Sequence, residues 1–512
     1  MPSIISASLR RPFVAAATFA LRLLSRRANA GFHVSLAQPE LAQDRLLARL
    51  LKKLARTEYG KHCGLRGDED YRQFRTRIPI QTYDELEPWL SRQLASKQAI
   101  ITPDPVVHIE PTSGSSGARK SIPYTRTMLR GFSNMFRIWV HDLICHGPGF
   151  KTGRIFISSS PAATDKGFDT DLEYLDQPLR FLLAPFLLAP PRGNKQDFVQ
   201  DLAVSLLHAR DLEVISIWSP SYLLVVLDHI RDQRVELAAA LPDPAKTALL
   251  AVPVNWQDLW PDLKLVSCWD NALSSGLAAQ LRELFPRVLV QGKGLLATEA
   301  PITVPLQGVA GSVPLLDDVF LEFESADGDI KRLHELDIGA SYQLIISQAA
   351  GLMRYRLGDL VEVVGCYRST PTLIFIGRAG QVCDLVGEKL NEVFVRQSLE
   401  ALMPEGRFVL VPDGRGYVLL SETVSPALAS SAEAALCRAH HYALARRQGQ
   451  LSPLRVQQLP NLLVELRKLQ QKSEIKAGDI KDTALITNRQ QATKLLARCA
   501  DNQIVETVQT TV

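Results

Sequence analysis

The residues best suited to chemistry form one short stretch, Pro111–Lys120, which reads PTSGSSGARK. Glycines can adopt left-handed backbone conformations and let a ligand approach the main chain closely, as a loop around a phosphate requires. Hydroxyl side chains add hydrogen-bond donors for phosphate oxygens, and a lysine adds a positive charge. The stretch therefore indicates a phosphate-binding loop, although a Ser/Gly-rich surface loop explains the same composition equally well. The residues concerned are Thr112, Ser113, Gly114, Ser115, Ser116, Gly117 and Lys120.

The spacing of this stretch excludes two common motifs. Aligned on Gly114, a Walker A loop needs its second glycine at the position of Arg119, so a P-loop nucleotidase is disfavoured. Gly114 and Gly117 lie one residue too close together for the Gly-x-Ser-x-Gly elbow of a hydrolase. The seven cysteines form no CxxC pair and the ten histidines show no zinc-type spacing. We therefore expect reduced thiols and a cytoplasmic location.

The stretch resembles the phosphate loop of adenylate-forming enzymes, and three further segments follow it in the order of that superfamily. Leu296–Glu299 resembles the segment whose glutamate holds Mg²⁺, although the family's usual tyrosine is missing before Thr298. Tyr355–Asp359 is similar to the Tyr-Arg-x-Gly-Asp segment whose aspartate binds the ribose hydroxyls. Gly377 and Arg378 resemble the start of the hinge to a C-terminal domain. The resemblance implies that the chain uses ATP and Mg²⁺.

Within that superfamily the chain is most similar to the auxin-responsive (Gretchen Hagen three) family of acyl-acid amido synthetases, and is identified as a bacterial-type member. The resemblance covers nearly the whole chain, from about Gln43 to Ile486. The segments that carry it most specifically are Leu352–Asp359, Gly387–Glu392, Gly478–Lys481, Thr57–His62 and Ile78–Leu86.

The resemblance also implies roles for individual residues. Glu299 is the implied metal ligand, and Glu299, Lys481 and Lys120 are the implied catalytic residues. Lysines are common on protein surfaces, so a solvated position explains Lys389 and Lys481 as well as a nucleotide contact at the hinge and a catalytic role in the cap, respectively. The implied nucleotide-binding residues outside the phosphate loop are Thr298, Glu299, Asp359, Arg378 and Lys389.

Four residues are weaker candidates for binding the organic substrate. Arg137 lies on the helix expected after the phosphate loop and suits a substrate carboxylate, but a solvated helix face explains it better. Trp218, Tyr222 and Trp269 lie near the ends of expected strands and suit an acyl pocket, yet aromatic residues there are more often simple core.

Composition indicates a globular chain without a nucleic-acid or membrane role. The chain has 512 residues, of which 46% are hydrophobic and 22% charged, and its net charge of +4 is too weak to indicate nucleic-acid binding. The longest apolar stretch, around residues 181–190, is too short to span a bilayer. The basic residues 1–30 faintly resemble a secretory signal, but arginines interrupt the apolar part, so we favour a structural helix.

The hydrophobic pattern predicts an α/β fold with two domains. A leucine stripe predicts a helix over residues 36–55, and strand-like runs at 154–159, 212–218, 263–269 and 288–291, with a helix at 272–284, predict a mainly parallel sheet. Closely spaced strands over residues 319–376 predict an antiparallel sheet or small barrel. Beyond them, a helix near 392–402, a hairpin at 408–421 and a helix at 427–447 predict an α+β cap. We expect an adenylate-forming domain over residues 1–386 and a mobile cap over residues 387–512.

The resemblance implies activation of a carboxylic acid by ATP as an acyl-adenylate, with release of pyrophosphate. The acyl group is then transferred to an amine, commonly an amino acid in this family, with release of AMP. An acyl-CoA ligase is the alternative enzyme, and a non-catalytic nucleotide-binding protein is the alternative outside enzymes. No carrier-protein domain is expected within the chain.

Overall fold

The computed structural model describes most of the chain. The described residues are 7–113, 119–157, 171–188, 198–272, 274–379, 382–383, 385, 388, 390–403, 407–414, 416–425, 427–447, 450–471, 483–499 and 504–507. They form two compact units, of which the first comprises Met1–Trp218, Val226–Trp269 and Leu281–Phe375, and the second comprises Ser219–Val225, Asp270–Gln280 and Ile376–Val512. The domain boundary that the sequence predicts between residues 386 and 387 differs from this division and stays a prediction. Among the described residues, no helix combines the length and the apolar character needed to cross a bilayer.

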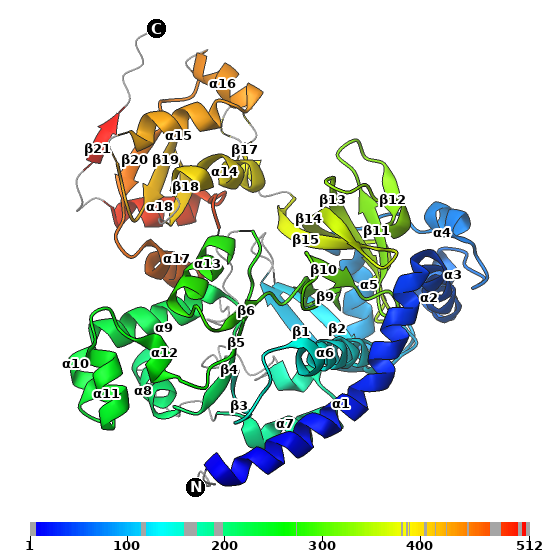
Figure 1. Cartoon of the computed structure of the whole chain (residues 1–512). Coiled ribbons are helices and arrows are strands. Elements are labelled where there is room, and N and C mark those ends of the chain that lie inside the picture. Colours follow the sequence, from blue (N-terminus) through cyan, green and yellow to red (C-terminus); the bar gives the residue numbers. More distant parts are fainter. Residues whose placement is uncertain are drawn as a thin grey trace. The chain divides into compact units, whose positions relative to one another are not determined.

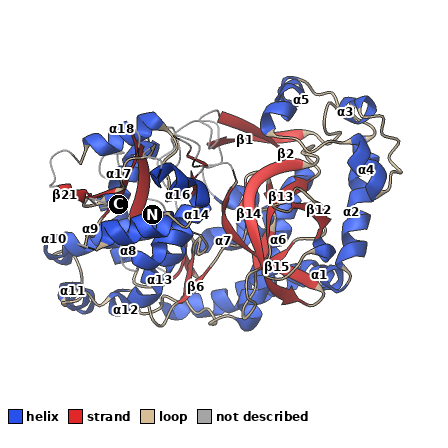
Figure 2. Cartoon of the chain, turned by 90° about the horizontal axis from the view of Figure 1, so that it is seen from above, coloured by secondary structure: helices blue, strands red, loops and turns tan. Residues whose placement is uncertain are grey.

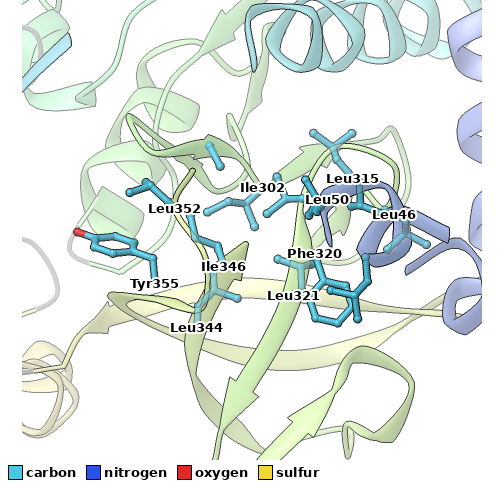
Figure 3. Packing of buried hydrophobic residues seen from close by; sticks show 14 of the residues in the cluster. Leu46, Leu50, Ile302, Leu315, Phe320, Leu321, Leu344, Ile346, Leu352 and Tyr355 are labelled. Atoms are coloured by element: carbon cyan, nitrogen blue, oxygen red, sulfur yellow. The ribbon is translucent and has the colours of Figure 1, made fainter. Parts of the chain in front are cut away.

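The first unit begins with helices, as the sequence predicts. The basic N-terminal segment is helix α1 (Ala7–Ala37), and the leucine stripe is helix α2 (Pro39–Leu54), in which Leu46, Leu47, Leu50, Leu51 and Leu54 are buried. Figure 3 shows Leu46 and Leu50 beside Phe320 and Leu321 in one apolar cluster. Three shorter helices follow, each with an N-cap side chain: α3 (Glu58–His62), α4 (Tyr71–Arg77) and α5 (Tyr83–Ala95).

A four-stranded parallel sheet confirms the predicted α/β rhythm. Its order is β3 (Arg154–Ile157), β4 (Leu212–Ser216), β5 (Leu265–Ser267) and β6 (Leu289–Gln291), with every neighbouring pair parallel. Parallel neighbours need long crossovers, and these are helical here. The crossover helices are α7 (Gln177–Leu183), α8 (Phe198–His208), α9 (Pro220–Asp232), α10 (Arg234–Ala238), α11 (Asp243–Leu250), α12 (Trp256–Leu259) and α13 (Ser274–Leu284).

A buried carboxylate organises the amino-terminal edge of this sheet. Glu213 is fully buried and accepts hydrogen bonds from the backbone N–H groups of Lys151, Thr152 and Gly153 at 2.7, 2.9 and 2.8 Å. Lys264, at the start of β5, pairs with the same carboxylate at 3.2 Å. The charge of Glu213 is thus compensated inside the fold, so the edge at which β3 begins is held rigidly.

The closely spaced strands form a seven-stranded sheet rather than isolated hairpins. Its order is β12 (Ile330–Arg332), β11 (Phe320–Glu324), β13 (Ser341–Ser347), β14 (Tyr355–Tyr367), β15 (Thr370–Arg378), β10 (Ser312–Pro314) and β9 (Thr303–Pro305). The pairings of β11 with β12 and β13, and of β13 with β14, are antiparallel, as predicted. Helix α2 lies along this sheet, on the outer side of the unit (Figure 2).

Two hairpins and a long helix complete the first unit. Strands β1 (Val106–Ser113) and β2 (Arg119–Thr125) pair antiparallel on either side of the predicted phosphate loop. Helix α6 (Arg126–His146) follows β2 and lies beside α1 (Figure 1). The short strands β7 (Leu296–Ala297) and β8 (Ala300–Pro301) form a tight hairpin whose turn is Thr298 and Glu299.

The second unit is the α+β arrangement that the sequence predicts beyond the hinge. Its sheet has the order β18 (Phe408–Asp413), β19 (Gly416–Ser421), β20 (Arg455–Gln458) and β21 (Ile504–Thr507). The first two strands form the predicted antiparallel hairpin. The other α-helices and strands that follow β15 in this unit are β16 (Val382–Cys383), β17 (Leu390–Asn391), α14 (Glu392–Leu399), α15 (Leu428–Leu436), α16 (His440–Arg447), α17 (Leu462–Gln471) and α18 (Arg489–Ala497).

The prediction of one helix over residues 427–447 is wrong in one respect, because the structure has two helices there, α15 and α16. Glu433 on α15 pairs with Arg446 on α16 at 2.6 Å and accepts a hydrogen bond from the backbone N–H of Leu454 at 2.7 Å. A continuous helix would carry Arg446 away from Glu433. Because the chain turns between the two helices, the buried carboxylate of Glu433 binds both α16 and the segment that contains Leu454.

Candidate active site

The centre of the candidate site is a lysine, a tyrosine and a glutamate from three different hairpins and strands. Lys120 on β2 donates a hydrogen bond from Nζ to the hydroxyl of Tyr355 at 3.3 Å. That hydroxyl in turn donates to Oε1 of Glu299, in the β7–β8 turn, at 3.5 Å. A cation and a carboxylate, both predicted to contact ATP, are therefore joined through one phenol hydroxyl.

Aromatic rings hold the ammonium of Lys120 in place. Its Nζ lies 5.4 Å from the ring centroid of Tyr83 and 5.9 Å from that of Tyr355, which is the range of cation–π contacts. The hydroxyl of Tyr83 accepts a hydrogen bond from the backbone N–H of Ser121 at 2.9 Å, and this fixes the ring beside β2. Burial raises the pKa of Tyr83, so this phenol stays protonated.

The turn that carries Glu299 is fixed by two buried side chains. The hydroxyl of Tyr124 donates to the backbone carbonyl of Thr298 at 2.6 Å, and the amide of Gln348 donates to the carbonyl of Glu299 at 3.2 Å. Burial raises the pKa of Tyr124, which keeps this donor protonated. The main chain around Glu299 is therefore bound on both sides, while only 8% of the residue is exposed.

Tyr355 is positioned by the residue that precedes it. Arg354 has a left-handed backbone, with φ of +47°, and its buried guanidinium donates from Nε to Glu322 at 2.9 Å. Its Nη1 donates to the carbonyl of Ile78 at 2.8 Å, and its own carbonyl accepts from the N–H of Gln81 at 3.0 Å. Arg354 thus joins the start of β14 to the segment before α5. Figure 3 shows the ring of Tyr355 at the border of the core with its hydroxyl directed outward.

The structure describes only the two ends of the predicted phosphate loop. The backbone of Thr112 pairs with Lys120, and that of Ser113 pairs with Arg119, so the β1–β2 hairpin brings both ends of the loop together. The four central residues, Gly114, Ser115, Ser116 and Gly117, lie outside the described residues.

The other nucleotide-binding candidates have different positions. Asp359 lies on β14, the strand that begins with Tyr355, and is 2% exposed. Arg378 is the last residue of β15 and belongs to the second compact unit. Lys389 and Lys481 lie outside the described residues.

The four substrate-side candidates do not form one group. Arg137 on α6 is ion-paired with Asp176, the N-cap of α7. Trp218 and Trp269 lie together, with ring centroids 5.8 Å apart. Tyr222 belongs to the second unit, where the guanidinium of Arg467 lies 5.9 Å from its ring centroid.

Three contributors to this arrangement were not singled out from the sequence: Tyr355, Tyr83 and Tyr124. Tyr355 lies within a recognised motif, but the motif draws attention to its aspartate. Tyr83 lies within the resemblance segment Ile78–Leu86, and Tyr124 follows Pro111–Lys120 by four residues, so their positions were a signal. What each hydroxyl contacts is visible only in the fold.

We expect Tyr355→Phe to slow the reaction at this site without disturbing the fold. The ring and its packing remain, whereas the hydroxyl that joins Lys120 to Glu299 is lost. Both hydrogen bonds are long, so together they contribute about 0.6–1.4 kcal/mol, and the rate of ATP–pyrophosphate exchange should fall roughly 3- to 10-fold. Exchange and thermal unfolding are measured together. An unchanged rate at an unchanged unfolding temperature would contradict a role for this hydroxyl.

Comparison with known proteins identifies the family. Residues 29–244 match the GH3 family N-terminal domain, and residues 313–378 match the GH3 family central domain. The indole-3-acetic acid-amido synthetase GH3.8 of Oryza sativa subsp. indica is 23% identical over 72% of this chain and 72% of its own length. The jasmonoyl–L-amino acid synthetase JAR4 of Nicotiana attenuata is 22% identical over 70% of this chain and 72% of its own length.

Solved structures show the same fold. The GH3.15 acyl acid amido synthetase in complex with 2,4-DB superposes with a TM-score of 0.77 at 17% identity, covering 93% of this chain and 96% of that one. A 2-hydroxyisobutyryl-CoA ligase in the postadenylation state superposes with a TM-score of 0.59 at 14% identity, covering 90% of this chain and 92% of that one. The matched domains together span more than half of the chain, so the chain belongs to the GH3 family.

Proposed function

We propose that the protein joins a carboxylic acid to an amine at the expense of ATP. In the first half-reaction, a carboxylate oxygen bonds to the α-phosphorus of ATP, the bond to the bridging oxygen breaks, and pyrophosphate leaves with that electron pair. In the second, the amine nitrogen bonds to the acyl carbon, AMP leaves, and the nitrogen loses a proton to solvent. The product is an amide, and an amino acid is the amine that the family resemblance favours.

The observation that carries this proposal is the Lys120–Tyr355–Glu299 arrangement. Negative charge builds up on the phosphates as pyrophosphate leaves, and a fixed cation stabilises it without reorganisation. Lys120 is such a cation, since it contacts the rings of Tyr83 and Tyr355 and donates to the hydroxyl of Tyr355. Positioning and charge neutralisation are all that the first half-reaction demands, so no nucleophilic side chain is needed.

The residues present also fit Mg²⁺. Magnesium usually takes one or two protein carboxylates and completes its shell with water and substrate phosphates. Glu299 offers one carboxylate on a turn whose main chain is fixed on both sides. Within the described ranges no three His, Cys, Asp or Glu side chains cluster as metal ligands. When bound, Mg²⁺ supplies charge neutralisation at the phosphates.

We expect Asp359→Ala to weaken ATP binding far more than turnover. A carboxylate that binds the ribose hydroxyls acts equally before and during phosphoryl chemistry, so its loss removes uniform binding. The KM for ATP should rise about 10- to 100-fold, which corresponds to a hydrogen bond with a charged partner. Because Asp359 is buried, Asp359→Asn is measured beside it to separate charge from packing. A normal KM with a collapsed kcat would place Asp359 near the reacting phosphate instead.

The second compact unit supplies the remaining parts of the proposal. We assign Arg378 and Lys389 to nucleotide contacts at the hinge, and Lys481 to catalysis, on the family resemblance alone. A cap that closes during the first half-reaction and opens for the amine would let Lys481 act in only one of the two steps. The cytoplasmic location and the bacterial-type membership also stay predictions from the sequence.

The test of the proposal is isotope exchange between pyrophosphate and ATP with a panel of carboxylic acids. Exchange that requires both an acid and Mg²⁺ supports an adenylating enzyme. ATP binding without acid-dependent exchange would support the alternative, a non-catalytic nucleotide-binding protein. Lys120, Glu299 and Asp359 occur together in this chain, which favours the enzyme, because nucleotide binding alone does not need all three.

A further inference from the structure

Helix α1 lies on the outside of the first unit, and one of its sides is packed into that unit (Figure 1). The packed side carries Val14, Leu21, Phe32 and Leu36, which are all buried. Leu21 belongs to an apolar cluster with leucines of α7, whereas Phe32 and Leu36 belong to the large core. The hydroxyl of Thr370 donates to the carbonyl of Leu36 at 2.9 Å. The rotation of α1 about its own axis is therefore fixed.

The opposite side of α1 presents large apolar side chains to solvent. Phe19, Leu23 and Val34 are 64%, 54% and 70% exposed. With 3.6 residues per helical turn, these three side chains project within about 60° of one another and point away from the packed side. Phe13 and Leu24, at 64% and 42% exposed, border them. Apolar side chains gathered in this way on an exposed face indicate an interaction surface.

Three arginines accompany this apolar surface. Arg22, Arg26 and Arg27 are exposed, and they all lie within about one helical turn of Leu23. Residues 1–39 contain five arginines and neither Asp nor Glu, a formal charge of +5. The whole chain has a net charge of +4, so residues 40–512 together carry −1. The expectation that the chain has no membrane role rests on this bulk charge, which conceals a basic segment.

An apolar strip bordered by arginines is complementary to an anionic bilayer surface. Aromatic and leucine side chains of an interfacial helix insert at the boundary between headgroups and acyl chains. Guanidinium groups bind phosphate oxygens, and their long apolar stems let the charged ends reach the headgroups. The negative potential of an anionic leaflet also attracts basic segments. Because α1 is already folded and packed, binding requires no ordering of the helix.

Two other occupants of this surface are less suited to it. A second copy of the chain would place its own arginines against Arg22, Arg26 and Arg27, and like charges oppose such contact. An acidic protein would match the charge, but tight protein interfaces seat anchoring side chains in pockets. The outer side of a single helix is convex, and fluid lipid adapts to a convex surface without a matching shape.

We propose that α1 attaches the protein to membrane surfaces that contain anionic phospholipids. Phe19 and Leu23 insert into the interface, and Arg22, Arg26 and Arg27 bind the headgroup phosphates. The helix lies in the plane of the surface and does not span the bilayer. This attachment goes beyond the proposed function and does not depend on it, because neither ATP nor an acid takes part in lipid binding.

The test is flotation of the full chain with two kinds of vesicle. One kind contains phosphatidylcholine alone, and the other contains equal parts of phosphatidylcholine and phosphatidylglycerol. We expect binding to the anionic vesicles only, and weaker binding as the NaCl concentration rises. Arg26→Gln combined with Arg27→Gln should raise the apparent Kd for anionic vesicles about 10- to 30-fold. Phe19→Gln combined with Leu23→Gln should raise that Kd at least about 10-fold.

Matched controls remove the same kinds of side chain elsewhere in the first unit. Arg72→Gln combined with Lys246→Gln removes two exposed positive charges. Val235→Gln combined with Ile338→Gln removes two apolar side chains that are 75% and 66% exposed. Both controls should keep the Kd within about twofold of the wild type, as is usual for surface substitutions. Thermal unfolding of all four double variants should match the wild type, because every substituted side chain is exposed.

The inference is overturned if the wild type does not bind the anionic vesicles, or binds neutral vesicles equally well. It is also overturned if the controls weaken binding as much as the α1 variants do. Sedimentation of the protein without lipid tests the second copy as occupant. A dimer that is lost in the Phe19→Gln, Leu23→Gln variant would assign the surface to self-association. Capture by immobilised polyglutamate, without vesicle binding, would assign it to an acidic protein, and either result would contradict membrane attachment.

Discussion

Glu299→Gln is expected to reduce acid-dependent pyrophosphate exchange by about 10²- to 10³-fold, which corresponds to roughly 3–4 kcal/mol of transition-state stabilisation. The amide keeps the size of the side chain and can still accept a hydrogen bond from the hydroxyl of Tyr355, but it lacks the negative charge that a metal ion needs. The turn itself should survive, because Tyr124 and Gln348 bind its backbone carbonyls rather than the carboxylate.

The control for this prediction is Glu324→Gln, which neutralises a partly buried carboxylate on β11 that pairs with Arg356 at 2.8 Å. Exchange by the control should stay within about twofold of the wild type, as is usual for a substitution away from the reacting groups. Near-normal exchange by a correctly folded Glu299→Gln protein would remove Glu299 from the metal site.

Arg354→Met is expected to destabilise the first unit by about 3–5 kcal/mol. The substitution leaves the carboxylate of Glu322, which is fully buried, without its guanidinium partner, and removal of one member of a buried pair is costly. The same change also frees the carbonyl of Ile78 from its donor. The apparent free energy of unfolding is measured by urea titration.

Arg356→Met tests whether burial is the reason for that loss. Arg356 pairs with Glu324 on the same two elements, but 35% of its side chain is exposed. A partly exposed pair contributes little, so this variant should lose no more than about 1 kcal/mol. Equal losses of stability in the two variants would contradict burial as the reason. A double variant, Arg354→Met with Glu322→Leu, should recover part of the stability, because it also removes the buried carboxylate that has lost its partner.

The elements of the fold were largely predictable because burial imposes a period on the sequence. The leucine stripe of α2 indicates which face of the helix is buried, and short apolar runs indicate the strands β3 to β6. Both patterns are local, so predicting these elements needs no knowledge of contacts between distant residues. The turn between α15 and α16 could not be read in this way, because it depends on Glu433 meeting Arg446 and Leu454, and these contacts exist only in the folded unit.

The candidate site was predictable in its parts but not in its assembly. Lys120, Glu299 and Asp359 stand in recognisable segments, whereas the phenol between the first two comes from the start of another strand. Lys120, Glu299 and Tyr355 are far apart in the sequence, so their contacts are visible only in the folded unit.

The central claim is that an activated acid passes to an amine, and the most direct measurement is mass analysis of the products. The protein is incubated with ATP, Mg²⁺ and an acid that supports exchange, and either a mixture of amino acids or coenzyme A is added. The account predicts AMP and an amide whose mass equals acid plus amino acid minus water, with no thioester in the parallel sample. An acyl-CoA thioester, formed in the absence of any amide, would contradict it.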